Sequence, residues 1–491
     1  MRLINKILFA FALFSVTSPA MSQDEGEDAQ QLDGLIDAVA RAYGGAALME
    51  IRNYRITERY IAPGTGQSWN PELINIGHVN QEFVHDIEAG NVYFENWFMG
   101  RGGLFPTVTI VNGENAWAVN IQTNRYGDAA SADPYVIAGG TMRTTDTLLV
   151  RELLKSRADA EHLGNAVFMN RAHDMIKIPF PQSPDLTLYI DSETHLLSRM
   201  TRENPQLGLL DYVFRDHYVR KGITRAARTN FFVAGDPNLI GAKREIRFND
   251  SIAASTFSLP EGLEQEGARI NATEMQVNRL ANNVYHVGQN AGFSIFVDTG
   301  NEVIGCGGYP GLTQRLEKFR EESGSHRPLR YQVVTHHHQD HLGGINEALD
   351  LGATLVTIPD NIETISAAAA TPPESGRFLT VNQRLTLGSG NGRVELYDVA
   401  TIHSMSNLLF YVPGSRTLFM ADHFGSPYEK GTPVANRNTV SMSEALEPLD
   451  LNYNKIVTAH GARVFTARDF DNSVKAYRDY DCPDDRPLCS I

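Results

Sequence analysis

The sequence predicts an α/β layered domain preceded by an antiparallel domain of α+β type, and two patterns carry this prediction. From residue 269 to the C-terminus, apolar strand-like runs alternate with helical patterns, as they do in layered α/β domains. From residue 51 to residue 259, short alternating segments are instead separated by Gly, Asn, Asp and Pro turns. A chain of 491 residues is long enough for two domains. We therefore predict one domain at 32–261 and another at 269–491, joined by a polar segment.

The N-terminus has the pattern of a secretory signal peptide over residues 1–22. Two basic residues come first, an apolar run follows at 7–16, and small residues suited to cleavage come next. The apolar run is too short to span a bilayer comfortably. We therefore expect a protein that is periplasmic or secreted, without stable membrane insertion. Residues 23–31 are acidic and polar, and we expect a flexible lead there.

The first domain is expected to begin with a helix, because apolar residues recur at helical spacing from Leu32 to Tyr43 and two glycines then end the pattern. A second helix is expected between Asp146 and Ala160. Alternating patterns predict strands at 54–60, 107–111, 116–120, 175–178 and 186–190. Repeated short strands with one or two helices indicate a curved antiparallel sheet.

This pattern, together with the segments 191–199 and 257–260, resembles the half-barrel of periplasmic lipoprotein-carrier domains. The resemblance implies an apolar concave face that could hold an acyl chain or another hydrophobic group. The alternative is that the first domain only supports or shields the second.

The second domain is expected to start with a strand pair, 284–287 and 293–298, followed by a strand at 302–306 and a helix at 312–319. Cys306 lies in an apolar run and is expected to be a buried core residue. Cys482 and Cys489 bracket a turn-rich segment near the C-terminus and could close a small disulfide loop.

A dense polar cluster follows the apolar run 331–335, where the next strand is expected, and Leu342-Gly343-Gly344 after it can open a helix. Within six residues the cluster places His336, His338, Asp340 and His341. These imidazole and carboxylate groups cannot be buried together unless other groups satisfy their polar atoms. A metal ion satisfies them together, and His with Asp is the donor set of a zinc-like site rather than a calcium site. The alternative is a solvated, histidine-rich loop.

The pattern His-x-His-x-Asp-His resembles the signature of the metallo-β-lactamase superfamily. The further elements of that family's pattern follow in order, with His403 before the apolar run 408–412, Asp422 after the run 418–421, and His460 after the run 456–459. The resemblance covers residues 269–470. It implies a four-layer αβ/βα sandwich with metals at one edge between two sheets.

The resemblance also implies a ligand set for two metal ions. The metal ligands that it assigns are His336, His338, His403, Asp340, His341, Asp422 and His460. The first three would bind one ion, Asp340, His341 and His460 would bind the other, and Asp422 would bridge them. Asp340 is also the residue expected to act in catalysis. We expect two Zn²⁺ per chain, although the same donors accept iron or manganese. His337 is expected to point away from its neighbours and not to be a ligand.

These ligands predict an exported dinuclear metal-dependent hydrolase, in which a metal-bound hydroxide cleaves an ester, lactone, thioester or amide bond. Hydrolysis of β-lactams is less favoured, because Asp422 stands where several zinc β-lactamases carry cysteine, although Ser404 and Asn407 match the lactamase arrangement. A mononuclear iron enzyme that oxidises sulfur substrates is a second alternative. A non-enzymatic lipid or ligand carrier is a third. The complete second ligand set speaks against both.

The net charge of -15 speaks against a nucleic-acid partner, which needs a basic face. The expected partner is a small-molecule substrate, acylated or hydrophobic in character. His423, Tyr309 and Tyr428 lie near the expected site, and we expect structural roles for all three.

Overall fold

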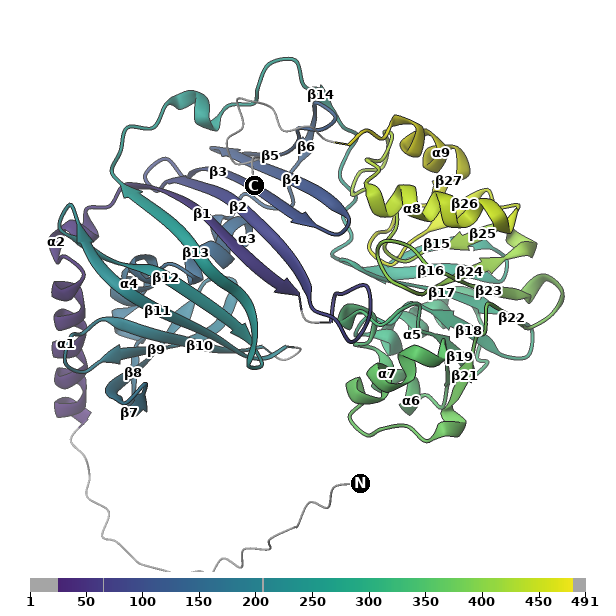
Figure 1. Cartoon of the computed structure of the whole chain (residues 1–491), viewed down its shortest axis with the longest axis horizontal. Helices are drawn as coiled ribbons and strands as arrows, with labels where there is room; N and C mark the ends of the chain where they lie inside the picture. The colour runs from purple at the N-terminus through teal and green to yellow at the C-terminus, as the bar shows by residue number, and fades with distance from the viewer. Residues whose placement is uncertain (1–24, 65, 205–206, 480–491) are drawn as a thin grey trace, which may run out of the picture.

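The computed structural model describes residues 25–64, 66–204 and 207–479. An N-terminal unit built on one large curved sheet lies beside a C-terminal unit built on two smaller sheets (Figure 1). The predicted signal peptide, residues 23 and 24, and both Cys482 and Cys489 lie outside the described residues. None of the helices in the described ranges combines the length and the apolar composition that a membrane span requires.

The N-terminal sheet confirms the predicted curved antiparallel arrangement. Among the described residues its strand order is β14-β6-β5-β4-β3-β2-β1-β13-β12-β11-β10-β9-β8-β7. Neighbours from β6 to β7 are antiparallel, and only β14 pairs in parallel, with β6 at one edge. The strands are β1 Asn53–Gly64, β2 Asn75–Asp86, β3 Asn91–Gly100, β4 Gly103–Asn112, β5 Asn115–Asn120, β6 Arg125–Asp128, β7 Glu161–Phe168, β8 Arg171–Phe180, β9 Ser183–Asp191, β10 Leu197–Asn204, β11 Gly208–Arg220, β12 Ile223–Val233, β13 Asp236–Phe248 and β14 Glu264–Gln265.

The helices of this unit are α1 Glu25–Ala42, α2 Ala46–Met49, α3 Pro134–Arg143 and α4 Asp146–Lys155. The helix predicted at 146–160 is α4. Helix α1 starts at Glu25, so most of the segment expected as a flexible lead is helical, in keeping with the helix propensity of its Glu, Ala and Gln residues. Helix α3 was not predicted, because Gly139 and Gly140 weaken the helical pattern and Ala138 has non-helical dihedral angles.

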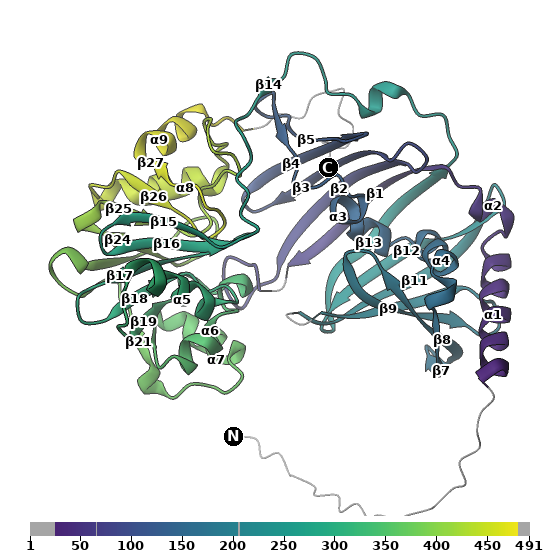
Figure 2. The same cartoon turned by 180° about the vertical axis from the view of Figure 1, so that it is seen from behind.

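Helices α3 and α4 lie within the curve of the sheet (Figure 2). Met142 of α3 and Leu149 and Leu153 of α4 belong to one apolar core with sheet residues such as Phe83 and Ile176. The carrier-like pattern implies an apolar concave face that could hold an acyl chain, and the chain itself partly fills this face.

The C-terminal unit has two sheets, with strands in the sequential orders β15 to β21 and β22 to β27 among the described residues. The first sheet contains β15 Gln276–Ala281, β16 Val284–Gln289, β17 Gly292–Asp298, β18 Val303–Cys306, β19 Leu329–Val333, β20 Thr354–Thr357 and β21 Phe378–Thr380. The second contains β22 Arg384–Leu387, β23 Val394–Val399, β24 Asn407–Val412, β25 Thr417–Phe419, β26 Lys455–Val457 and β27 Phe465–Thr466. The strands, and the helix at 312, confirm the elements predicted here.

The layer order follows from the apolar clusters. One cluster fills the space between the two sheets, and the buried Cys306 belongs to it as predicted. A second cluster joins the outer face of the first sheet to α5 Leu312–Ser323, α6 Ile345–Asp350 and α7 Ile362–Ala368. A third joins the outer face of the second sheet to α8 Arg437–Leu446 and α9 Ala467–Ala476. The predicted four-layer αβ/βα sandwich is confirmed.

Candidate metal centre

The structure brings all seven predicted ligands together at one edge of the two sheets. They follow the strands β19, β23, β25 and β26, because the C-terminal ends of these strands meet at that edge. Two donor sets form, and within each set one ligand atom per residue lies within 4.8 Å of the others. The sets are His336, His338, His403 and Asp422, and Asp340, His341, Asp422 and His460. Asp422 is common to both.

Close backbone packing fixes the loop that carries four of these residues. A Cβ atom at Gly308 would lie 1.8 Å from the carbonyl oxygen of His341, and one at Gly344 would lie 2.6 Å from that of Tyr309. Only glycine allows the loop at 308–309 and the loop at 341–344 to approach each other so closely. Gly308 and Gly344 therefore allow this approach, and Gly344 precedes α6 without a side-chain cap.

A strained turn carries Asp422. Ala421 has a φ of 45°, which is unusual for a residue with a side chain, and it lies two residues after the end of β25. Strain of this kind costs about 1–3 kcal/mol and persists where the surrounding structure determines it. Here the strained residue lies in the turn that places the Asp422 carboxylate between the histidines of the two donor sets.

In the first set, two imidazole nitrogens and a carboxylate oxygen converge. His403 Nε2 lies 3.1 Å from His336 Nε2 and 3.2 Å from Asp422 Oδ2, and His336 Nε2 lies 3.6 Å from the same oxygen. His336 and His338 are buried. Buried His338 Nδ1 has no hydrogen-bond partner among the described residues, and coordination of a cation would satisfy this nitrogen.

In the second set, His341 Nε2 lies 2.8 Å and His460 Nε2 lies 3.2 Å from Asp422 Oδ1. Asp340 Oδ2 lies 3.5 Å from His341 Nε2 and 3.6 Å from His460 Nε2. His460 is the exposed member of this group, with 39% of its side chain accessible. The second set is thus open to solvent on the His460 side.

The electrostatics favour the protonation states that bind cations. Burial, together with the neighbouring imidazoles of His341 and His338, holds the pKa of His336 well below its usual range. Burial and His403 lower the pKa of His338 to about 3. Burial alone would raise the pKa of Asp422, but His341 and His336 outweigh it and hold that pKa well below its usual value. Neutral imidazoles at His336 and His338 beside the ionised Asp422 are the donor forms that transition metals need. Burial alone would lower the pKa of His460, but Asp422 outweighs it and raises that pKa. The residues present therefore fit a metal pair.

Tyr309, expected to be structural, reaches the second donor set. Its hydroxyl donates to Asp340 Oδ2 at 2.8 Å and lies 2.8 Å from the ring nitrogens of His460. Burial and the charge of Asp422 raise the pKa of this phenol, so it stays a hydrogen-bond donor. The sequence placed Tyr309 near the site but gave no sign of these contacts.

The other neighbours are arranged differently. His423 is buried behind the first set, where its Nδ1 donates to the carbonyl oxygen of Met420 at 3.1 Å and its Nε2 lies 3.0 Å from Thr401 Oγ1. His337 is buried and belongs to neither donor set. Tyr428 lies away from both sets and lines a cavity between the two units.

The β1–β2 loop of the N-terminal unit, residues 66–74, contacts the site and was not predicted to do so. The Nε2 of Gln67 donates to Asp340 Oδ1 at 2.8 Å, and the indole of Trp69 donates to the carbonyl oxygen of Thr401 at 2.8 Å. These contacts join residues about 270 to 330 positions apart. No pattern in the sequence relates such distant segments.

Ser68 of this loop determines the tautomer of His338. His338 Nε2 lies 2.9 Å from the carbonyl oxygen of Ser68. A carbonyl oxygen can only accept, so Nε2 carries the proton and Nδ1 keeps its lone pair. Contacts of this kind orient metal-binding histidines. The N-terminal unit thus keeps Nδ1 of His338 in the unprotonated form that can bind a metal ion.

The family comparison agrees with the fold of the C-terminal unit. Residues 279–460 match the family model described as the metallo-beta-lactamase superfamily. A metallo-beta-lactamase from Pontibacter korlensis is 18% identical over 41% of this chain and 98% of its own, with a TM-score of 0.33. The DIM-1 metallo-beta-lactamase is 17% identical over 41% of this chain and 96% of its own, with a TM-score of 0.32. The chain matches none of the curated proteins with which it was compared.

Proposed function

We propose that this protein is a metal-dependent hydrolase with two metal ions in the C-terminal unit. The observation that carries the proposal is the sharing of Asp422 between two donor sets. An anionic bridge offsets the repulsion between two cations held close together, so the shared carboxylate favours a pair of ions over one. We propose zinc, since imidazole and carboxylate are its usual ligands, and iron or manganese would accept the same donors.

When bound, such ions lower the pKa of water and polarise the bond to be cleaved. His336, His338 and His403 would hold one ion, and Asp340, His341 and His460 the other. Asp340 accepts hydrogen bonds from Gln67 on one oxygen and from Tyr309 on the other, so both its oxygens are oriented. Tyr309 also lies against His460 and thereby fixes the open side of the site.

We propose an ester, lactone, thioester or amide as the bond cleaved, in a small-molecule substrate of acylated or hydrophobic character. The shared ligand is a carboxylate, not a cysteine, which supports such hydrolysis over hydrolysis of β-lactams. Export to the periplasm or the medium is also proposed, on the pattern of residues 1–22. Sequencing the N-terminus of the protein recovered outside the cytoplasm tests it.

The test of the function is a panel of chromogenic esters, lactones, thioesters, amides, phosphodiesters and cephalosporins on the metal-replete protein. We expect turnover of at least one carboxylic-acid derivative, with a loss of about 10³-fold or more for His338→Ala, because removal of a ligand to the metal removes what activates the water. The exposed His326 serves as a control, and His326→Ala should be fully active. Turnover that survives His338→Ala would refute the proposal.

A further inference from the structure

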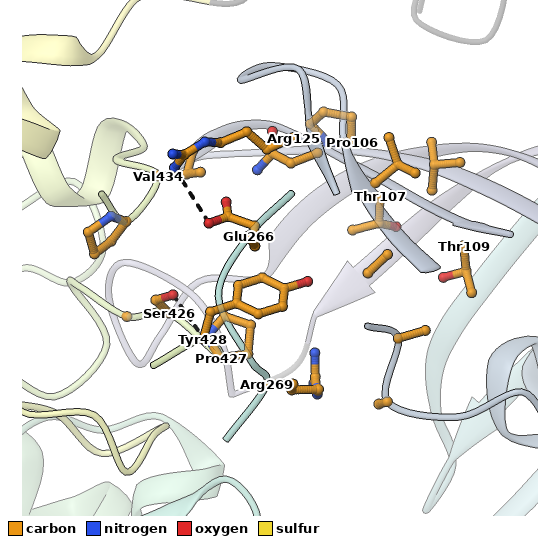
Figure 3. A pocket seen from close by; sticks show the side chains of 18 of the residues that line it. Pro106, Thr107, Thr109, Arg125, Glu266, Arg269, Ser426, Pro427, Tyr428 and Val434 are labelled. Atoms are coloured by element: carbon orange, nitrogen blue, oxygen red, sulfur yellow. Dashed lines mark hydrogen bonds and ion pairs between the residues drawn. The ribbon is translucent and has the colours of Figure 1, made fainter. Parts of the chain in front are cut away.

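A cavity of about 540 Å³ lies between the N-terminal sheet and the loop 425–434 of the C-terminal unit (Figure 3). This volume is within the range of about 300–1,000 Å³ that is usual for small-molecule sites. Its lining is largely apolar and comes from both units. It includes Phe94, Ala118, Val136, Ile137, Pro427 and Val434. Val136 is apolar and yet 52% exposed, so its side chain would lose contact with water if the cavity were filled.

The cavity exists because residues become small along one row of the sheet. Phe94, Thr109, Ala118 and Gly127 are successive cross-strand partners on β3, β4, β5 and β6. Cross-strand partners share a face of the sheet. The side chains on this face therefore become smaller along the row, from the phenyl ring of Phe94 to Gly127, which has no side chain. Tyr428 packs over the last position, where a Cβ atom at Gly127 would lie 2.4 Å from its Cε1. Space for a ligand remains over Thr109 and Ala118.

A neighbouring cavity reaches the candidate metal centre at His460. This second cavity, of about 850 Å³, is lined by the candidate ligand His460. Both cavities share the lining residues Ala129, Ala130, Arg269, Gly425, Ser426 and Pro427. A single elongated ligand can therefore reach from His460 to the apolar region between the two units.

One cation lies where the two cavities meet. Arg125 pairs with Glu266 at 3.5 Å at the far side of the first cavity, whereas no ion pair joins Arg269 to a carboxylate among the described residues. Arg269 approaches the cavity beside the Tyr428 ring (Figure 3), and its charge opposes the rise that burial causes in the pKa of that phenol. A guanidinium group in this position suits an anionic group on the ligand.

We propose that the two cavities bind a long-chain acyl substrate with a carboxylate close to the scissile bond. The acyl chain occupies the apolar cavity over Thr109 and Ala118, the carboxylate contacts Arg269, and the scissile bond lies on the His460 side. This inference rests on the proposed hydrolytic function and adds the substrate class.

The test compares dodecanoyl and acetyl forms of whichever substrate the wild-type protein cleaves, each with and without a carboxylate. Each buried methylene is worth about fourfold in affinity, so we expect kcat/KM to favour the dodecanoyl form at least about a hundredfold. Ala118→Phe, which fills the cavity, should abolish this preference for the dodecanoyl form. Ala172→Phe, an equal change at an exposed position of β8, should retain the preference.

Arg269→Gln should lower the ratio of kcat/KM for the carboxylate forms to kcat/KM for the uncharged forms about tenfold or more, since a charge-assisted hydrogen bond is lost. Calorimetric binding of dodecanoate to the metal-free protein gives a readout without turnover, and Ala118→Phe should weaken it while Ala172→Phe does not. Equal kcat/KM for both chain lengths, or dodecanoate binding unchanged by Ala118→Phe, overturns the substrate class. Absence of all hydrolysis would instead refute the proposed function, whatever dodecanoate does.

Discussion

Asp422 is the residue on which both donor sets depend. Its two oxygens face different histidines, His403 and His336 on one side and His341 and His460 on the other. The carboxylate is held at the end of β25 by a backbone in the left-handed region at Ala421. At the residue scale, the proposal therefore depends on one side chain in one strained turn.

Gln67 tests the contribution of the N-terminal unit to this site. Gln67→Ala removes the amide that donates to Asp340 Oδ1, and we expect metal affinity at the second set to fall about 10-fold, as for other residues that orient ligands. The measurement is competition with a chromogenic chelator. Glu72→Ala, an exposed change in the same loop, is the control and should bind metal as the wild type does. An affinity unchanged by Gln67→Ala would show that this contact does not orient Asp340.

At the scale of elements, strands with a clear local pattern were predictable and the contacts between units were not. Strands such as β4 and β9 alternate in sequence, and β24 is a continuous apolar run, so local pattern was enough. Seven ligands could be assigned because each belongs to a motif placed next to a strand. Helix α3 escaped prediction because its glycines weaken the pattern, although packing against the sheet supports it. The roles of Gln67 and Ser68 depend on tertiary contacts alone.

The contact between β6 and the loop that carries Tyr428 can be tested by adding one methyl group at Gly127. Gly127→Ala places a Cβ atom against the Tyr428 ring, and we expect a loss of about 1 kcal/mol in the free energy of unfolding. Gly376→Ala is the control, because nothing lies within 4 Å of the added atom there. Urea titration measures both.

Tyr428→Ala should relieve the effect of Gly127→Ala, since the atoms that clash are then absent. If Gly127→Ala costs as much in the Tyr428→Ala background as in the wild type, the two residues do not pack as described.

At the scale of the whole molecule, the N-terminal unit makes three contributions. Its large sheet packs around α3 and α4. The β1–β2 loop of this sheet contacts the candidate metal centre. The row from Phe94 to Gly127 lies beside the cavity between the two units. The stability of this unit should therefore determine the integrity of the site.

His85 gives the stability of the N-terminal unit a dependence on pH. Burial, with the charge of Lys155 adding to it, lowers the pKa of His85 to about 4. Between an unfolded pKa near 6.5 and this folded value, the unfolded state binds more protons, so stability falls as the pH falls. At pH 5 this amounts to about 2 kcal/mol relative to pH 7. His85→Gln should therefore lose less stability than the wild type between these pH values, by urea titration. Equal losses would contradict this account of His85.

The metal content of the purified protein tests the central claim most directly. Elemental analysis of wild-type protein, loaded with zinc and then freed of loosely bound ions, should give two ions per chain. His460→Ala should lower that value, because it removes a donor from the second set only. A single ion per chain in the wild type, unchanged by His460→Ala, would contradict the two-metal site.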